Sequence, residues 1–331
     1  MTFPFYSGKP QQECVKRATE LPVVKFDVRE DASAYHADQG LVDAVNVALL
    51  LGQPLLVTGE PGTGKTQLAY SLGCELGYDV EKFETKSTST SRDLFYTYDY
   101  LSRFHAAQLR EGSIEAKEYI TYNALGIAIL RSRERSSIEQ LLPEKFEHDG
   151  SRRTIVLIDE IDKAPRDFPN DLLNEIEGMY FKVPELGWSA QRIVCEPRMR
   201  PIIVITSNSE KNLPDAFLRR CIYYNIPFPN RTRLLAIVLS HAKDADIGDR
   251  EWVQDALDLF LKLREPARAL DKPPATAELM NWLTYLRSRN VDDTKGLRTQ
   301  SHLTLSSVSA LCKNQGDQEK AASIIREWLT E

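Results

Sequence analysis

The residues best suited to chemistry form a glycine-rich run that lies between a short apolar segment and an amphipathic one. The run reads Gly-Glu-Pro-Gly-Thr-Gly-Lys-Thr over residues 59–66. Such a loop wraps backbone N–H groups around a phosphate, while its lysine reaches the β and γ oxygens and its threonine binds Mg²⁺. A glycine-rich turn that binds nothing is the alternative, and the strand-like and helix-like flanks disfavour it. We assign the binding of a nucleotide's phosphates to Gly59, Glu60, Pro61, Gly62, Thr63, Gly64, Lys65, Thr66 and Gln67.

Two adjacent carboxylates, Asp159 and Glu160, follow another apolar run at residues 155–158. If that run is a buried parallel strand, both carboxylates lie at the carboxyl edge of the sheet, which is the ligand side of such folds. We expect Asp159 to hold Mg²⁺ through its water shell and Glu160 to polarise the attacking water. An acidic pair in this position can also cap a helix, so the assignment depends on the glycine-rich loop.

Further polar residues follow the next apolar run. Asn208 ends it, and a side-chain amide there can orient the attacking water beside Glu160, although an ordinary turn asparagine is the alternative. Arg219 and Arg220 precede the last apolar run of this part of the chain. They are either solvated surface cations or include an arginine finger, which stabilises charge on a neighbouring subunit's nucleotide during phosphoryl transfer.

The elements that position these residues alternate between strands and helices. Continuous apolar runs predict strands that are covered on both faces, as in the parallel sheet of an α/β fold. We place these strands at residues 55–58, 80–84, 154–159, 201–207 and 221–226. Helical spacing predicts helices that begin after the glycine-rich loop and at residues 122 and 166, and two short runs at residues 180–183 and 192–195, joined through residues 184–189, predict a β-hairpin.

The character of the sequence changes at Pro227-Phe228-Pro229. Beyond these prolines every periodic segment is helical, with helices expected at residues 232–243, 251–264, 276–287, 303–313 and 318–330. We therefore predict an α/β nucleotide-binding domain over residues 1–228, with an insertion near 86–148 and the hairpin near 180–196, and an all-helical domain over 229–331.

Composition excludes several classes of protein. The 331 residues include 42% hydrophobic and 27% charged residues, which describes a folded chain, and no apolar run approaches the ~20 residues of a membrane span. The five cysteines are scattered and the histidines lack metal-binding spacing, so neither a disulfide framework nor a zinc site is expected. A net charge of −6 disfavours nucleic acid as the main ligand. Without a secretory signal, we expect a cytoplasmic protein.

The order of these motifs resembles the AAA+ ATPases, and more closely their MoxR family. Residues 159–165, Asp-Glu-Ile-Asp-Lys-Ala-Pro, are similar to that family's DEINRAP-type motif, and residues 59–66 to its GxPGxGKT loop. The resemblance spans residues 35–286. It implies a P-loop AAA+ core with a helical lid, hydrolysis of Mg-ATP, a hexameric ring and chaperone-like remodelling of a protein, often one with a von Willebrand factor A domain. It also favours Arg220 over Arg219 as the finger and makes Asn208 the first sensor.

Two elaborations agree with the resemblance, and one feature departs from it. Roughly seventy residues separate two strands where about a dozen suffice, and this insertion and the hairpin match in position the ones that decorate the ring in the MoxR group. The insertion is rich in aromatic side chains, which suit either partner contact or plain packing: Phe95, Tyr96, Tyr98, Tyr100 and Phe104. The family's second-sensor arginine is missing, since residues 274–277 read Pro-Ala-Thr-Ala. Either Arg268 or Arg287 takes its place, or the lid is coupled more weakly to the nucleotide, and the role stays unassigned.

Three functions remain open from the sequence. The first is an ATPase that converts hydrolysis into remodelling of a protein partner. The second is a nucleotide-controlled switch or scaffold with slow turnover, in a regulatory or defence module. The third is a motor on nucleic acid, such as a GTP-using relative, which the acidic charge and the lack of a basic, aromatic-rich segment disfavour.

Overall fold

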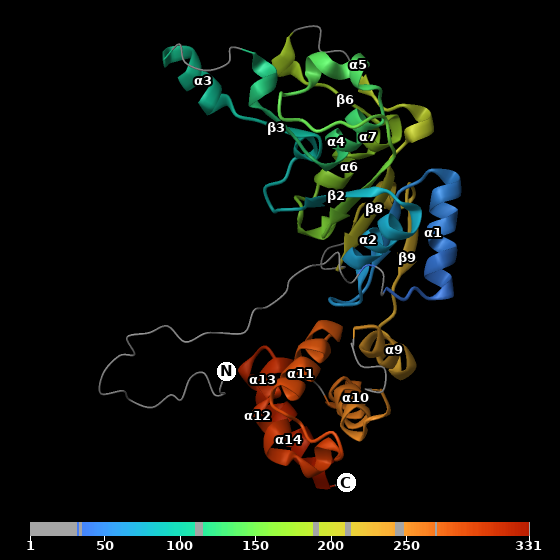
Figure 1. Cartoon of the computed structure of the whole chain (residues 1–331), viewed down its shortest axis with the longest axis vertical. Helices are drawn as coiled ribbons and strands as arrows, with labels where there is room; N and C mark the ends of the chain where they lie inside the picture. Colours follow the sequence, from blue (N-terminus) through green and yellow to red (C-terminus); the bar gives the residue numbers. More distant parts are fainter. Residues whose placement is uncertain are drawn as a thin grey trace. The chain divides into compact units, whose positions relative to one another are not determined.

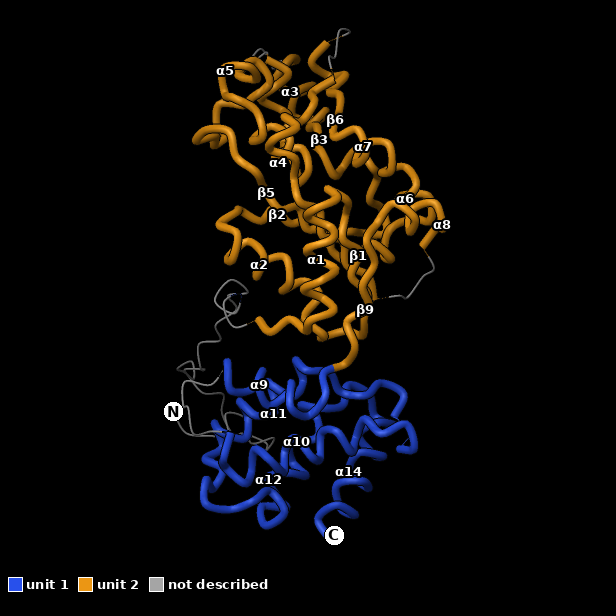
Figure 2. Tube along the Cα trace, turned by 90° about the vertical axis from the view of Figure 1, so that its right-hand side faces the viewer, with its two compact units in different colours: residues 1–34, 229–331 blue, residues 35–228 orange. Residues whose placement is uncertain are grey.

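The computed structural model describes residue 32 and residues 35–109, 115–187, 192–208, 213–241, 248–268 and 270–330. The chain divides into two compact units, one of residues 35–228 and another that contains residues 229–331 (Figure 2). Residues 1–31, which the predicted nucleotide-binding domain includes, lie outside the described residues.

A five-stranded parallel sheet forms the centre of the first unit (Figure 1). Its order is β2-β5-β8-β1-β9, and register pairs Leu55 with Val204 on one side and with Ile222 on the other. Strand β8 therefore lies between the strand that precedes the glycine-rich loop and the strand that ends in the carboxylates. The strands are β1 (Leu55–Thr58), β2 (Asp79–Glu84), β5 (Thr154–Asp159), β8 (Ile202–Ser207) and β9 (Ile222–Asn225).

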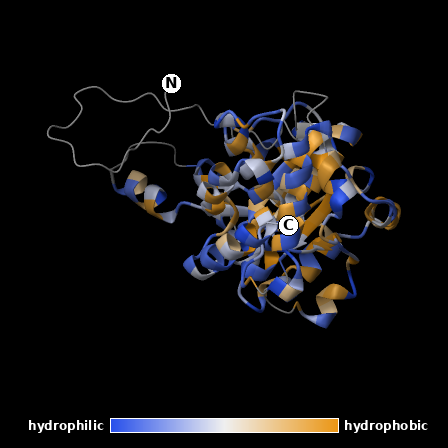
Figure 3. Cartoon of the chain, turned by 90° about the horizontal axis from the view of Figure 1, so that it is seen from below, coloured by the Kyte–Doolittle hydropathy of each residue, from blue (hydrophilic) through white to orange (hydrophobic). Residues whose placement is uncertain are grey.

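The apolar runs are continuous because both faces of the sheet are covered. Alternate side chains point to opposite faces of a strand. Leu157 and Val204 pack with helices α1 (Gln39–Leu51) and α2 (Lys65–Leu76). Val156 and Ile205 belong to the cluster that contains residues of α4 (Ala124–Arg131), α6 (Phe168–Asp171), α7 (Leu173–Gly178) and α8 (Asp215–Leu218). Hydrophobic residues concentrate in these elements, whereas the loops are mostly hydrophilic (Figure 3). The predicted α/β class is confirmed.

The predicted insertion contains a small sheet and several short helices. Strands β3 (Tyr96–Tyr98) and β4 (Ile120–Tyr122) pair antiparallel. The other elements are η2 (Ser91–Leu94), α3 (Tyr100–Leu109), η3 (Ala116–Tyr119), α5 (Arg135–Ile138) and η4 (Glu139–Leu141). The single helix expected from residue 122 is shorter, because α4 ends before Ser132, whose hydroxyl bonds to the carbonyl of Ile129 at 2.6 Å.

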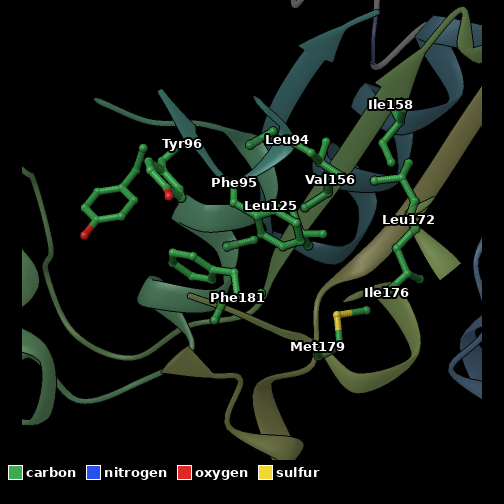
Figure 4. Close-up of a cluster of buried hydrophobic side chains, with 14 of the residues drawn as sticks. Leu94, Phe95, Tyr96, Leu125, Val156, Ile158, Leu172, Ile176, Met179 and Phe181 are labelled. Carbon is green, nitrogen blue, oxygen red and sulfur yellow. The ribbon is translucent and has the colours of Figure 1, made fainter. Parts of the chain in front are cut away.

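The aromatic residues of the insertion divide between packing and exposure. Phe95, Tyr96 and Tyr98 are buried, so plain packing accounts for them. Phe95 stacks on Phe181 with ring centroids 5.3 Å apart (Figure 4). Tyr100 and Phe104 on α3 remain 57% and 58% exposed, so partner contact stays open for these two alone.

Strands β6 (Tyr180–Phe181) and β7 (Ile193–Val194) pair antiparallel where the sequence predicts a hairpin, and residues 188–191 between them lie outside the described part of the chain. Helix η6 (Pro184–Leu186) lies between them and carries Glu185. The carboxylate of Glu185 accepts hydrogen bonds from the hydroxyls of Tyr96, at 2.8 Å, and Tyr100. These bonds tie the hairpin to the insertion.

The second unit is helical throughout its described residues. Its core contains the buried side chains of Trp252, Trp282 and Trp328. The helix expected over residues 303–313 is two helices, because Ser307 interrupts it: its hydroxyl donates to the carbonyl of Thr304 at 2.8 Å and accepts from the indole of Trp282 at 2.7 Å. The helices are α9 (Arg231–His241), α10 (Glu251–Leu263), η9 (Pro266–Arg268), α11 (Thr276–Ser288), η10 (Leu297–Thr299), α12 (Ser301–Ser306), α13 (Val308–Leu311) and α14 (Gln315–Thr330). Residues 242 and 243, predicted as the end of the first of them, lie outside the described residues.

Within the described residues, no helix combines the length and the apolar character that crossing a membrane requires.

Candidate functional site

The glycine-rich loop connects the end of β1 to the start of α2 and has the backbone of a phosphate cradle. Gly59, Gly62 and Gly64 have φ angles of +148°, +76° and +88°, which favour glycine. A Cβ atom on Gly59 would lie 2.7 Å from the carbonyl oxygen of Ile226. Gly64 immediately precedes α2, so the positive end of the helix dipole faces the loop.

The predicted loop residues occupy this cradle together. Lys65 is 6% exposed, and its ammonium donates to the carbonyl oxygens of Gly59 at 2.9 Å and Glu60 at 2.8 Å. Burial lowers the pKa of Lys65, and nearby carboxylates, Asp162 foremost, oppose that shift. The lysine is therefore held at the centre of the loop, where anionic phosphate oxygens are better acceptors than neutral carbonyls. Thr63 is buried, and Gln67 lies half-buried in the first turn of α2.

Thr66 and Asp159 form an oxygen-rich pair that fits Mg²⁺. The Thr66 hydroxyl donates to Asp159 Oδ1 at 2.9 Å, and the Thr206 hydroxyl donates to the same oxygen at 2.7 Å. Asp159 is only 8% exposed. Hydroxyl and carboxylate oxygens are the hard ligands that Mg²⁺ prefers, and it keeps several of its own waters. Thr66 and Asp159 are thus suited to hold the ion that a nucleotide brings.

The residues expected to act on water also come together. Asn208 donates from Nδ2 to Glu160 Oε1 at 3.0 Å, and its backbone N–H donates to Asp162 Oδ1 at 3.2 Å. Glu160 has a left-handed backbone, with φ 56° and ψ 53°, which costs a non-glycine residue of order 1–2 kcal/mol. The Thr206 hydroxyl also accepts from the Glu160 backbone N–H at 2.9 Å, and the ammonium of Lys163, in η5 (Ile161–Lys163), pairs with the Glu160 carboxylate.

Sequence reasoning missed the roles of Thr206 and Lys82. Thr206 lies on β8, two residues before Asn208. Because side chains alternate between the two sides of a strand, this spacing could have indicated that Thr206 shares a side with Asn208. Lys82 on β2 forms ion pairs with Glu84 Oε1 at 2.9 Å and Asp159 Oδ2 at 3.0 Å. Burial disfavours its charged form, but hydrogen bonds to these two carboxylates outweigh that effect and raise the pKa of Lys82. Nothing in the sequence points to Lys82, because its contact depends on strand order.

The two arginines lie at the amino ends of the strands, whereas the glycine-rich loop lies at their carboxyl ends. Both are exposed, and they follow α8 just before β9. The backbone N–H of Ile222 donates to the carbonyl of Pro54 at 2.8 Å, next to the start of β1, whereas the glycine-rich loop follows the end of β1. Arg220 pairs with Glu177 and donates from Nη1 to the Ala216 carbonyl at 3.0 Å. The fold therefore keeps Arg219 and Arg220 away from the chain's own loop.

Residues 274–277 lead into α11 without an arginine, and the backbone N–H of Ala275 donates to the Glu278 carboxylate at 3.1 Å. Arg268 pairs with Glu265 at 3.6 Å and Glu327 at 2.9 Å, and Arg287 is exposed. The second-sensor role therefore stays unassigned.

Comparison with protein families decides the family of the chain. The model of the AAA family, described as the ATPase family associated with various cellular activities, matches residues 55–229, which is more than half of the 331 residues. The chain belongs to this family. Membership implies ATP hydrolysis, and the nucleotide site described above lies within the matched residues. No protein of curated function matches the sequence.

Among solved structures, the RuvB Holliday junction branch migration motor of Thermotoga maritima is similar at 17% identity. That match has a TM-score of 0.44 and covers 87% of this chain and 70% of that one. A mutant of Thermotoga maritima RuvB matches at 17% identity with a TM-score of 0.46, over 88% of this chain and 72% of that one. At this identity the likeness does not indicate what this chain acts on.

We expect Lys65→Ala to weaken ATP binding by about a hundredfold or more, because the substitution leaves the phosphate charge without its buried ammonium. Isothermal titration calorimetry with Mg-ATP measures the change. Lys145→Ala, which removes an exposed lysine, is the matched control and should bind as the wild type does. Undiminished ATP affinity in Lys65→Ala would exclude the loop as the nucleotide site.

Proposed function

We propose that this chain hydrolyses Mg-ATP in a ring oligomer and uses the cycle to remodel or activate a protein partner, as MoxR-like ATPases do. The observation that carries the proposal is the 3.0 Å contact between the amide of Asn208 and the carboxylate of Glu160. A nucleotide-binding module needs the loop alone. An amide held against a carboxylate, beside the oxygens of Thr66 and Asp159, is the additional equipment of a hydrolase.

Each residue has one role in the proposed reaction. Lys65 and the backbone N–H groups of the loop bind the phosphates, and Thr66 and Asp159 hold Mg²⁺, which supplies charge neutralisation when bound. Glu160 accepts the proton of the attacking water, and Asn208 keeps the carboxylate in position. The hydroxyl of Thr206 accepts the backbone N–H of Glu160 and so helps to hold this residue in its left-handed conformation.

The finer assignment to MoxR-like remodelling rests on the wider motif around Asp159 and Glu160 and on elements outside the hydrolytic centre. The Asp-Glu-Ile-Asp-Lys-Ala-Pro motif, the insertion and the hairpin match the family's pattern. The exposed Tyr100 and Phe104 offer apolar surface on α3, and Glu185 ties that helix to the hairpin. These features support a protein partner, with a von Willebrand factor A domain protein as the candidate. The family resemblance further implies that residues 229–331 form a helical lid.

One observation favours the slow-turnover alternative. The ammonium of Lys163 pairs with Glu160 Oε2 while Asn208 donates to Oε1, so both oxygens of the carboxylate are engaged by side chains of the chain itself. On this alternative a partner protein would separate the pair and accelerate hydrolysis. Steady-state turnover measured with and without candidate partners distinguishes a constitutive ATPase from a partner-controlled switch.

We expect Glu160→Gln to retain ATP affinity but to lower turnover by about a hundredfold or more, because the amide keeps the shape of glutamate and loses its basicity. Phosphate release under saturating Mg-ATP measures turnover. Glu139→Gln, on an exposed turn of the insertion, is the matched control. Hydrolysis at the wild-type rate in Glu160→Gln would show that Glu160 is not the base.

We expect Arg220→Ala to lower turnover by on the order of 10³ with ATP affinity nearly intact, because a finger acts mainly as charge develops. Since Arg220 lies at the opposite edge of the sheet from its own loop, the finger must serve a neighbouring subunit. Mixing Arg220→Ala with Lys65→Ala should therefore restore part of the activity, while Arg219→Ala alone should remain active. If mixed rings form and stay inactive, the shared-site proposal is wrong.

A further inference from the structure

Lys82 forms an ion pair with the Asp159 carboxylate, and this pair links the proposed metal site to the edge strand β2 of the sheet. Strand β2 pairs with β5 in a register that places Glu84 beside Asp159 and Lys82 beside Leu157. Residues two apart on a strand share a face, so Lys82, Glu84 and Asp159 all lie on the same face. The Lys82 ammonium contacts Glu84 Oε1 at 2.9 Å and Asp159 Oδ2 at 3.0 Å.

The two oxygens of Asp159 have different partners. Oδ1 accepts hydrogen bonds from the hydroxyls of Thr66, at 2.9 Å, and Thr206, at 2.7 Å, and these two bonds fix the orientation of the carboxylate. Oδ2 faces Lys82. Because two hydroxyls already hold the carboxylate in place, the contribution of Lys82 is mainly its charge rather than orientation. The Lys82 ammonium and the hydrated metal ion would therefore compete for the same Asp159 carboxylate.

The two carboxylates that Lys82 contacts also differ in exposure. The Asp159 side chain is 11% exposed, whereas that of Glu84 is 70% exposed. The Lys82 side chain is 29% exposed, and its four-carbon stem is flexible. The ammonium can therefore leave Asp159 and keep a carboxylate partner at the surface, while a bound Mg²⁺ would replace it as the cation beside the buried Asp159 carboxylate.

We propose that Lys82 is the counter-cation of Asp159 when no metal ion is bound, and that Mg²⁺ displaces its ammonium toward Glu84. Lys82 and Glu84 would then together set the Mg²⁺ concentration at which the site binds the ion. The inference rests on the proposed function, because it takes Asp159 as the residue that holds the ion. Lys82 is thus a positioning residue that acts through Asp159. Glu84 acts on the opposite side of the same competition, since it attracts the ammonium away from Asp159.

Two substitutions with opposite expected signs test the proposal. Calorimetry measures the binding of a non-hydrolysable ATP analogue over a series of Mg²⁺ concentrations and gives the concentration of half-maximal effect. Lys82→Met removes the competing cation and should lower that concentration about three- to tenfold. Glu84→Gln leaves the ammonium with Asp159 alone and should raise it by a similar factor. Lys82→Arg keeps the charge and should stay close to the wild type.

Lys117→Met is the matched control, because Lys117 is similarly exposed, at 27%, and pairs with Glu115 at 2.9 Å in the insertion. A purely structural role of Lys82 would lower the unfolding temperature without moving the Mg²⁺ midpoint. An unchanged midpoint in both Lys82→Met and Glu84→Gln, or shifts of the same sign, would overturn the proposal. If Lys82→Met does not fold, the surface substitution Glu84→Gln still decides the question. A wild-type chain whose analogue binding ignores Mg²⁺ would instead contradict the proposed function itself.

Discussion

The Asp159 carboxylate, at the end of β5, contacts side chains from three other elements, and the rest of the site depends on this junction. Thr66 reaches it from the helix after β1, Thr206 from β8 and Lys82 from β2. Parallel strands bring their carboxyl ends to one edge, and the order β2-β5-β8-β1 places Asp159 among these three partners. Because Asp159 is almost fully buried, each partner offsets the cost of burying its charge.

The Thr206 hydroxyl extends this junction to Glu160, which we propose activates water with Asn208. It donates to Asp159 and accepts from the backbone N–H of Glu160, so one small side chain fixes the two carboxylates relative to each other. The backbone of Glu160 stays in its left-handed conformation because that bond and the contact with Asn208 hold it there. The proposed binding of the metal ion and activation of water are thereby linked through β8, which carries Thr206 and leads directly into Asn208.

The sequence predicted the central strands β1, β5 and β8 well because each is covered on both faces, whereas the edge strands β2 and β9 are partly exposed. Continuous apolar runs such as residues 155–158 are typical of such buried strands, and the glycine-rich loop fixes the direction of the first strand. Helix α1 was not predicted, although its signals are present: Asp38 caps its first turn, accepting from the Leu41 backbone N–H at 2.9 Å, and Gly52 ends it in a left-handed conformation. Within the insertion only the helix from residue 122 was predicted, because the shorter helices and strands lack enough turns for their periodicity to be recognised.

Within the site, the sequence indicated the residues that a motif contains and missed those that strand order brings in. Thr66, Asp159 and Asn208 belong to recognisable patterns, whereas the contact of Lys82 requires β2 to lie beside β5 in one particular register. Such a contact between distant segments leaves no local trace in the chain.

The most direct test of the Asp159 junction is the Mg²⁺ dependence of ATP-analogue binding in Thr206→Val, which keeps the shape of threonine but removes its hydroxyl. We predict analogue affinity without Mg²⁺ within about twofold of the wild type, because the loop is untouched, and a Mg²⁺ requirement raised about tenfold, because Asp159 loses its 2.7 Å donor. An unchanged Mg²⁺ requirement in a folded Thr206→Val chain would contradict the account, since the carboxylate would then not depend on the strand that positions it.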